Sequence, residues 1–126
     1  MSLIKIAKKL LDWNSENLIH DSVITNEKIA TLFAENFSVK ANGRTYQANY
    51  DNYREFLYQF KANISSIAYD VDKYIEAKPF VTIPMRARVA RTDGSVDMFE
   101  AILILEFDDQ DKIILWQEVY IKFEDV

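Results

Sequence analysis

Apolar residues recur at helical spacing in the N-terminal part of the chain. In the segment MSLIKIAKKLLDW they follow the pattern i, i+3, i+4 and i+7, which predicts a helix over roughly residues 2–13 with one buried face. A polar loop follows, and Thr25 or Asn26 then provides a helix cap. We predict a second helix from this cap to about Glu35, whose buried side is formed by Ile29, Leu32 and Phe33.

The third helical pattern is the clearest in the chain. Asn49 is suited to cap this helix, and Asp51 lies in its first turn, where a negative charge is favourable. Apolar residues then recur along one side at Tyr53, Phe56, Leu57, Phe60 and Ile64. This spacing predicts a helix with an aromatic buried face.

A short hairpin separates the second and third helices. Phe37, Val39 and Ala41 alternate with polar residues, and the dipeptide Asn42-Gly43 that follows is a strong signal for a two-residue hairpin turn. The two glycines of the protein are Gly43 in this turn and Gly94 after Asp93 in a second one. Such turns need positive φ angles, which glycine adopts without steric cost.

The C-terminal half changes to a period of two, which is typical of strands. In the first of four predicted strands, Ile67, Tyr69, Val71 and Ile75 share a face, and Lys78-Pro79 ends it. Three long strands follow, at 80–92, 96–107 and 113–123, joined by turns at 93–94 and 108–111. Because Pro84 has no N–H, the strand that contains it should have an edge or a bulge there.

Helices followed by a run of strands are typical of the α+β class, in which the helices pack on one face of a curved sheet. We therefore predict an α+β fold in which a cone-shaped, curved antiparallel sheet wraps around three N-terminal helices. A chain of 126 residues fits one domain, and we assign residues 1–126 to it.

Composition narrows the classes of function. The net charge of −5 argues against a nucleic-acid surface, because phosphate binding needs clustered Lys and Arg. There is no cysteine, which excludes disulfides and thiolate metal sites and is compatible with the cytoplasm, the location we expect. No apolar run reaches the ~20 residues of a membrane span. The acidic turn at 108–111 lacks the glycine and glutamate of a calcium loop, and we expect no metal, cofactor, nucleic acid or membrane partner.

The segments IATLFAENFSVKANGRTY, YREFLYQF and RARVARTDGSVDMFEAILILEFDDQDKIILWQEVYI occur in an order that resembles the nuclear transport factor 2-like (NTF2-like, cystatin-like) superfamily. The resemblance covers roughly residues 3–123 and is nearest to the SnoaL-like and ketosteroid-isomerase-like branch. It implies a cone in which a bent sheet wraps a long helix and leaves a pocket at its open end. It also implies that the protein is a homodimer through the outer sheet face.

The resemblance implies which side chains face that pocket. On the last strand these are Trp116, Glu118 and Tyr120. On the two preceding strands they are Arg86, Arg88 and Ala90, and Phe99, Ala101, Leu103 and Leu105. We take as candidate ligand-binding residues Trp116, Glu118, Tyr120, Arg86, Arg88, Tyr53, Phe56, Phe99 and Leu103, although a core role is favoured for Phe33 and Phe56.

The opposite, apolar face of these strands would then need a cover. It would comprise Met85, Ala87, Val89, Ile102, Ile104, Leu115, Val119 and Ile121. Exposed apolar patches of this size mark partner surfaces, and a second copy of the chain is the simplest partner.

The sequence departs from the isomerase pattern at each catalytic position that the resemblance implies. The carboxylate base falls on Ala41 or Asn42, the oxyanion-hole Asp on Leu103, and its Tyr near Lys9. Isomerase proton transfer is therefore not expected. The only histidine, His20, is expected in an exposed loop.

Two questions stay open at the level of sequence. Arg86, Arg88 and Glu118 could form a structural ion pair, which we favour, or a ligand anchor. The domain could bind a small, largely apolar or aromatic molecule, with the reaction unassigned and enzyme status undecided. Alternatively it could be a non-catalytic dimeric interaction domain whose pocket is filled by its own side chains.

Overall fold

The computed structural model describes residues 2–124 of the chain. It contains three helices and seven strands, in the order α1 (Leu3–Asn17), α2 (Asn26–Ala30), β1 (Phe33–Ala41), β2 (Arg44–Asn49), α3 (Tyr50–Lys61), β3 (Ile64–Val71), β4 (Ile75–Ala77), β5 (Phe80–Arg91), β6 (Val96–Phe107) and β7 (Ile113–Phe123).

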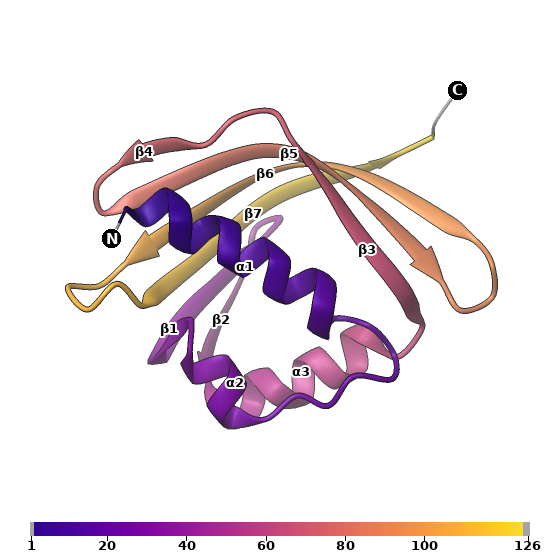
Figure 1. Ribbon diagram of the computed structural model, residues 1–126, viewed down its shortest axis with the longest axis horizontal. Coiled ribbons are helices and arrows are strands. Elements are labelled where there is room, and N and C mark those ends of the chain that lie inside the picture. Colours follow the sequence, from indigo (N-terminus) through magenta and orange to yellow (C-terminus); the bar gives the residue numbers. More distant parts are fainter. Residues whose placement is uncertain (1, 125–126) are drawn as a thin grey trace.

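The strands form one curved sheet in the order β2-β1-β7-β6-β5-β3, with β4 paired to β5. All three helices lie on the same side of this sheet, which bends around them (Figure 1). The α+β fold with a curved sheet around N-terminal helices is thus confirmed. One pair departs from the antiparallel pattern, because β1 runs parallel to β7.

Local signals in the sequence explain where several elements begin. Thr25 caps α2 by accepting a hydrogen bond from the Lys28 N–H, and Asn49 forms a reciprocal capping box with Asn52 at the start of α3. At the tip of the β1–β2 hairpin, Asn42 and Gly43 have φ angles of 48° and 87°, as the two-residue turn requires.

The ends of the first two helices differ from the prediction. Helix α1 continues to Asn17, because Asn14 and Asn17 extend its buried face with polar side chains that apolar periodicity does not reveal. Helix α2 ends at Ala30 instead of near Glu35. The buried residue Phe33 instead opens β1, where it pairs with Ile113 of β7.

The position of Pro84 agrees with the expectation of an edge. In the register of β5, β4 pairs with residues 80–82 and β3 with residues 85–91, so Pro84 lies between the two partners. Its missing N–H therefore interrupts no pair on that side, while its carbonyl accepts a hydrogen bond from the Asp72 N–H at 3.0 Å.

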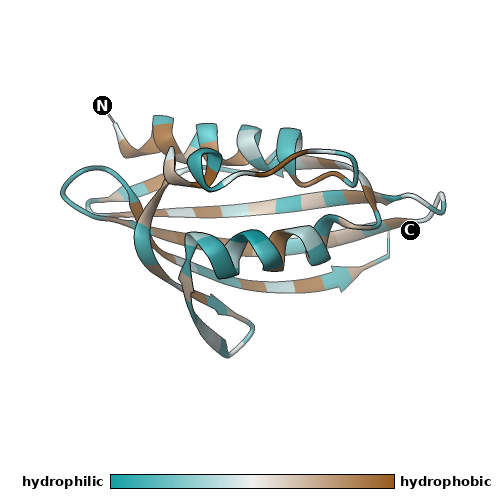
Figure 2. Ribbon diagram, turned by 90° about the horizontal axis from the view of Figure 1, so that it is seen from below, coloured by the Kyte–Doolittle hydropathy of each residue, from teal (hydrophilic) through white to brown (hydrophobic). Residues whose placement is uncertain are grey.

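The core lies between the sheet and the helices. Along the long strands hydrophobic and hydrophilic residues alternate (Figure 2), as expected for a sheet with one packed face. We call the face that packs against the helices the inner face. It carries the fully buried residues Val81, Ile83, Leu103, Leu105 and Ile113.

The register of β5 with β6 overturns one predicted face assignment. Met85 pairs with Ala101 and Ala87 with Phe99, so the odd-numbered residues of both strands share the inner face. Met85 and Val89 are buried at 3% and 6% exposure. Placing Met85, Ala87 and Val89 on the outer face is therefore wrong.

Candidate functional site

The central feature of the inner face is the carboxyl group of Glu118 on β7. Glu118 pairs with Ala41 of β1 on one side and with Leu103 of β6 on the other. These are positions where the resemblance places the carboxyl groups of an isomerase. The chain therefore has apolar residues at both positions and a single carboxyl group on the strand between them.

Burial controls the acidity of this group. It raises the pKa of Glu118 from 4.5 to about 7, and a hydrogen bond from the Trp116 side chain opposes part of this effect. Among residues 2–124, no Lys or Arg lies within salt-bridge distance of Glu118. Near neutral pH the carboxyl group is thus present in both its protonated and its ionised form.

Two tyrosines from other elements lie near Glu118. Burial raises the pKa of the Tyr53 hydroxyl on α3, and the charges of Tyr46, Tyr69 and Glu118 raise it further. The pKa of Tyr69 on β3 is also raised, mainly by burial and to a smaller extent by the negative charge of Glu118. A hydrogen bond from the Asn14 side chain opposes part of this increase. Both hydroxyls are therefore electrostatically coupled to the carboxyl group.

The backbone around Glu118 is held by Asn42 at the tip of the β1–β2 hairpin. The Asn42 N–H donates to the Glu118 carbonyl at 3.0 Å. The Asn42 side chain accepts from the Tyr120 N–H at 2.9 Å and donates to the Tyr120 carbonyl at 3.1 Å. This side chain continues the ladder beyond the end of β1 and fixes the register in which Glu118 faces inward.

An aromatic series leads from the interior to the surface along α3. Tyr53 is 7% exposed, whereas Phe56 and Phe60 are 45% and 44% exposed. Successive ring centroids are 6.0 and 6.1 Å apart, and the rings are stacked. The prediction that Phe56 belongs to the core is wrong, whereas Phe33, at 1% exposure, is a core residue as predicted.

The other candidate residues of β6 and β7 lie on the inner face as predicted. Trp116 is half-buried against the core, and Leu103 is fully buried beside Glu118. Phe99 and Tyr120 meet edge to face, with ring centroids 5.8 Å apart. Tyr120 is 36% exposed, so this pair lies nearer to solvent than Glu118. A ligand-binding role for these residues stays a prediction.

Arg86 and Arg88 do not join this group. They alternate with the inner-face residues Met85, Ala87 and Val89, of which Met85 and Val89 are buried, and therefore lie on the outer face. Arg86 pairs there with Glu100 of β6, with 3.8 Å between the guanidinium nitrogen and the carboxyl oxygen, and both side chains are more than half exposed. The predicted contact of Arg86 or Arg88 with Glu118 across the cone is wrong.

Sequence reasoning missed two residues of this region, Tyr69 and Asn14. The Asn14 side chain donates to the Tyr69 hydroxyl at 3.2 Å, and Asn14 is 4% exposed. In the sequence, Tyr69 is marked only by the alternation of its strand, and Asn14 lies beyond the predicted end of the first helix. The only sequence signals are that Asn14 continues the helical spacing of the apolar residues in α1 and that Tyr69 shares the alternating phase of the apolar residues in β3. His20 lies in an exposed loop, as predicted.

Two cavities in the described part of the chain do not have Glu118 in their walls. One of about 310 Å³ opens between α1 and β3 and has Tyr69 in its wall. The other, of about 170 Å³, is a shallow groove over β6 and β7 bounded by Ile102, Val119 and Ile121. Within residues 2–124, no helix is long and apolar enough to cross a membrane.

Comparison with solved structures identifies the fold. An NTF2-like protein from Anabaena variabilis is 12% identical, with a TM-score of 0.72 over 98% of this chain and 90% of that chain. An LEH-like epoxide hydrolase from M. tuberculosis is 10% identical, with a TM-score of 0.67 over 93% of this chain and 84% of that chain.

A third similar structure contains a small ligand. It is a protein with a ketosteroid isomerase-like fold from Catenulispora acidiphila in complex with trimethylamine, 14% identical, with a TM-score of 0.64 over 86% of this chain and 82% of that chain. No protein-family model and no curated protein matches the sequence. The chain therefore has the NTF2-like fold, and at these identities the likeness establishes the fold alone.

Proposed function

We propose that the inner face of the sheet binds a small, largely apolar molecule beside Glu118. The observation that carries this proposal is the placement of the carboxyl group. Glu118 is a half-buried acid without a basic partner among residues 2–124. It accepts a hydrogen bond from the Trp116 side chain, and its charge raises the pKa values of Tyr53 and Tyr69. A buried carboxyl group without a counter-ion opposes folding, and such groups are concentrated at functional sites.

The aromatic series on α3 supports an apolar ligand. Phe56 and Phe60 expose nearly half of their surfaces, while Tyr53 at the inner end of the series is buried. Tyr46 on β2 adds a fourth ring, 6.0 Å from Phe56 between centroids. An apolar molecule that covers Phe56 would remove hydrocarbon from water and come close to the interior around Glu118.

The carboxyl group suits a ligand that carries one polar group. With a pKa of about 7, Glu118 can accept a hydrogen bond when ionised and donate one when protonated. It could also exchange a proton with a bound molecule near neutral pH. Ala41 and Leu103 supply no second acid, so we assign no reaction.

The test uses two matched variants on adjacent strands. Glu118→Gln removes the inner carboxyl group, and Glu100→Gln removes an exposed one on the outer face. Both proteins and the wild type are heated with a panel of small aromatic and alicyclic compounds that carry one carbonyl, hydroxyl or amine group. We expect at least one compound to raise the Tm of the wild type and of Glu100→Gln but not that of Glu118→Gln.

Two results would contradict the proposal. One is a panel in which no compound shifts the Tm of the wild type. The other is a ligand-induced shift that Glu118→Gln retains in full, because binding would then not involve the inner carboxyl group. The first result would favour the non-catalytic interaction domain, with an interior filled by its own side chains.

A second proposal concerns the outer face, which we infer is the contact surface of a homodimer. Ile102, Val119 and Ile121 are 51%, 61% and 62% exposed and bound one groove. Adjacent exposed aliphatic residues on the middle strands of a sheet are typical of a covered surface. A two-fold contact would place the same patch of both copies face to face.

Light scattering with size exclusion tests this second proposal. Val119→Glu should convert a dimer into a monomer, because it would bury two carboxylates at the contact. Thr45→Glu, at an exposed position of the β2 edge strand, is the control and should remain dimeric. A wild-type protein that is monomeric at high concentration would contradict the dimer while leaving the ligand proposal untouched.

A further inference from the structure

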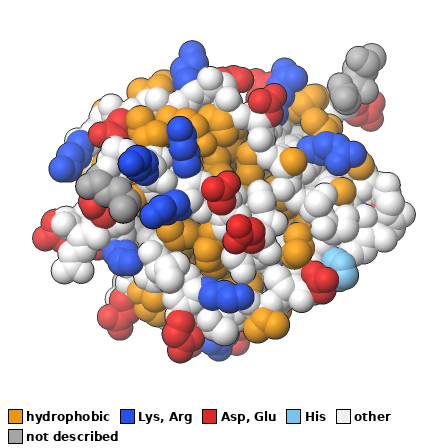
Figure 3. Space-filling model, in the orientation of Figure 1, with side chains coloured by type: hydrophobic (Ala, Val, Ile, Leu, Met, Phe, Trp, Pro, Cys, Tyr) orange, Lys and Arg blue, Asp and Glu red, His pale blue; other side chains and the backbone are white. Residues whose placement is uncertain are grey.

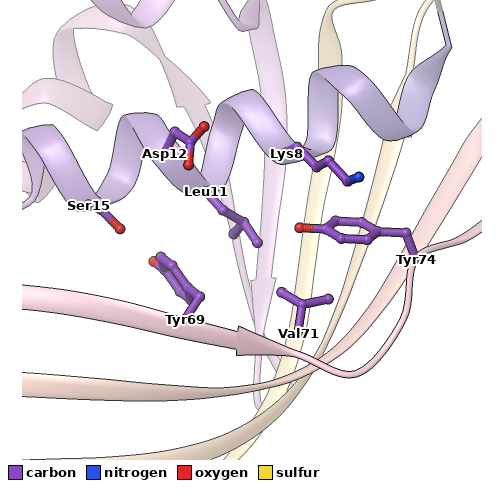
Figure 4. A pocket seen from close by; sticks show the side chains of 7 residues that line it. All are labelled: Lys8, Leu11, Asp12, Ser15, Tyr69, Val71 and Tyr74. Atoms are coloured by element: carbon purple, nitrogen blue, oxygen red, sulfur yellow. The ribbon is translucent and has the colours of Figure 1, made fainter.

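The cavity between α1 and β3 has a lining that differs from the aromatic interior. Its volume is about 310 Å³, within the range of small-molecule sites, and it is bounded by α1, β3 and the segment that leads to β4. Leu11 on α1 and Val71 on β3 are the aliphatic residues of its wall and face each other across the cavity, and the other lining residues carry charged or hydroxyl groups (Figure 4).

One positive and one negative side chain stand at this cavity. Lys8 and Asp12 are one helical turn apart on α1, so both project to the same side of the helix. Among residues 2–124, neither lies within salt-bridge distance of an opposite charge. Charged groups of both signs lie close together on the face that α1 crosses (Figure 3).

The Lys8 side chain is held over the cavity by an aromatic ring. Its ammonium nitrogen lies 5.3 Å from the centroid of the Tyr74 ring, which is a cation–π contact. The ring thus orients the ammonium group without neutralising its charge. Lys8 and Tyr74 approach each other from α1 and from the β3–β4 segment, across the cavity mouth (Figure 4).

Hydroxyl groups complete the wall. Ser15, Tyr69 and Tyr74 each contribute one. The Tyr69 oxygen accepts from Asn14 at 3.2 Å, which is the only hydrogen bond of this hydroxyl among residues 2–124, so its own proton has no acceptor there. The Tyr69 hydroxyl points toward Ser15 on the opposite wall (Figure 4), so its proton is available to a molecule bound between them.

These groups select a ligand by charge. An anion would be attracted by Lys8 and repelled by Asp12. A cation would be repelled by Lys8 and attracted by Asp12. A molecule with both a carboxylate and an ammonium group satisfies both side chains at once. We propose that this cavity is a second binding site, whose wall does not include Glu118 and which meets the Glu118 site only at Tyr69, for a small zwitterion of the amino-carboxylic acid class.

The experiment compares ligands that differ only in charge. Calorimetric titration uses ω-amino acids from glycine to 6-aminohexanoate, together with butyrate and butylamine as single-charge controls for 4-aminobutanoate. We expect one or more of the amino acids to bind at concentrations up to about 10 mM, and each single-charge control to bind at least about tenfold more weakly.

Variants on one helix identify the contacts. Lys8→Met and Asp12→Asn should each weaken binding by about tenfold or more, whereas Lys9→Met, an exposed neighbour outside the cavity, should leave it unchanged. The charge-swapped double variant Lys8→Asp/Asp12→Lys should recover part of the affinity, which a merely structural role would not allow. Glu118→Gln should retain binding, so this site and the Glu118 site can fail independently.

Three outcomes would overturn the proposal. The first is that no ω-amino acid binds in this concentration range. The second is that butyrate or butylamine binds as well as 4-aminobutanoate. The third is that Lys9→Met weakens binding as much as Lys8→Met, since the effect would then come from the overall charge of α1 and not from the cavity.

Discussion

Two acidic side chains on the inner face of adjacent strands have opposite surroundings. Asp97 on β6 lies near the end of the sheet, 3.0 Å from the Arg91 guanidinium and 2.9 Å from the Lys122 ammonium. Hydrogen bonds from Lys122 and Arg91 hold the pKa of Asp97 below its ordinary value. Glu118 on β7 has no cation within salt-bridge distance in the described chain, and burial raises its pKa to about 7.

The comparison separates a structural acid from a candidate functional one. Asp97 joins three strand ends through two ion pairs, so its charge favours the folded state. Glu118 has the reverse effect, because its ionised form is better solvated in the unfolded chain. Because ionised Glu118 weakens the fold, its position is not explained by stability, and ligand binding would explain it.

The largest expected effect comes from removing the inner carboxyl group. Between pH 4.5 and about 7 the folded protein holds the Glu118 proton, whereas the unfolded chain has released it, so stability falls as pH rises through this window. At pH 8, Glu118→Gln should therefore be more stable than the wild type by up to about 3 kcal/mol, and at pH 4 it should gain nothing.

Thermal unfolding from pH 4 to pH 8 checks this prediction. The Tm difference at pH 8 should be on the order of 10 °C, with Glu100→Gln as the control that follows the wild type. A variant whose advantage is the same at every pH would show that the carboxyl group is not buried as described.

A smaller effect is expected at Tyr69, which links the inner face to the cavity. Tyr69→Phe removes the hydroxyl that accepts from the buried Asn14 side chain. The unpaired amide should cost about 1–2 kcal/mol in the free energy of unfolding, measured with urea. Tyr74→Phe is the matched control from the other wall of the cavity, and an equal loss there would contradict this explanation.

A weaker effect with the opposite pH dependence is expected at Asp97. Its lowered pKa means that its contribution is present above its ordinary value of 3.8 and is lost as pH falls through the folded-state pKa. Asp97→Asn should therefore lower the Tm at pH 7, and this difference should shrink as pH falls below 3.8. If Asp97→Asn and Glu118→Gln changed the Tm in the same direction at pH 7, the contrast between the two acids would be lost.

The smallest effect is expected for Arg86→Ala on the outer face. The Arg86–Glu100 pair is 3.8 Å long and largely exposed, and such pairs contribute little. The free energy of unfolding of the monomer should change by less than about 0.5 kcal/mol. A loss several times larger would mean that Arg86 is covered, as it would be at a dimer contact.

Most of the fold could be predicted because the local signals agreed with one another. The alternation of Trp116, Glu118 and Tyr120 predicted that they share one face, and the family resemblance predicted that this face is the inner one. Asn42-Gly43 predicted the hairpin whose tip binds β7. Polar residues inside the core gave no such signal. The hydrophobic pattern therefore ended the first helix before Asn14 and missed its bond to Tyr69.

The face of β5 could not be predicted in the same way. Both phases of this strand contain apolar residues, and Arg86 and Arg88 alternate with Met85, Ala87 and Val89. Only the pairing of β5 with β6 decides whether the odd-numbered or the even-numbered residues of β5 are buried. A shift of this pairing by one residue would exchange the two faces of the strand.

The sequence by itself determined most elements, their order and the alternation along the last strand, since these depend on neighbours within a few positions along the chain. The tertiary structure alone decided that Glu118 has no cation within salt-bridge distance among residues 2–124, that Asp97 has two, and that Lys8, Asp12 and Tyr69 border one cavity. Acidity and binding depend on which groups meet in space across the sheet and α1, and that proximity arises only when distant segments pack together.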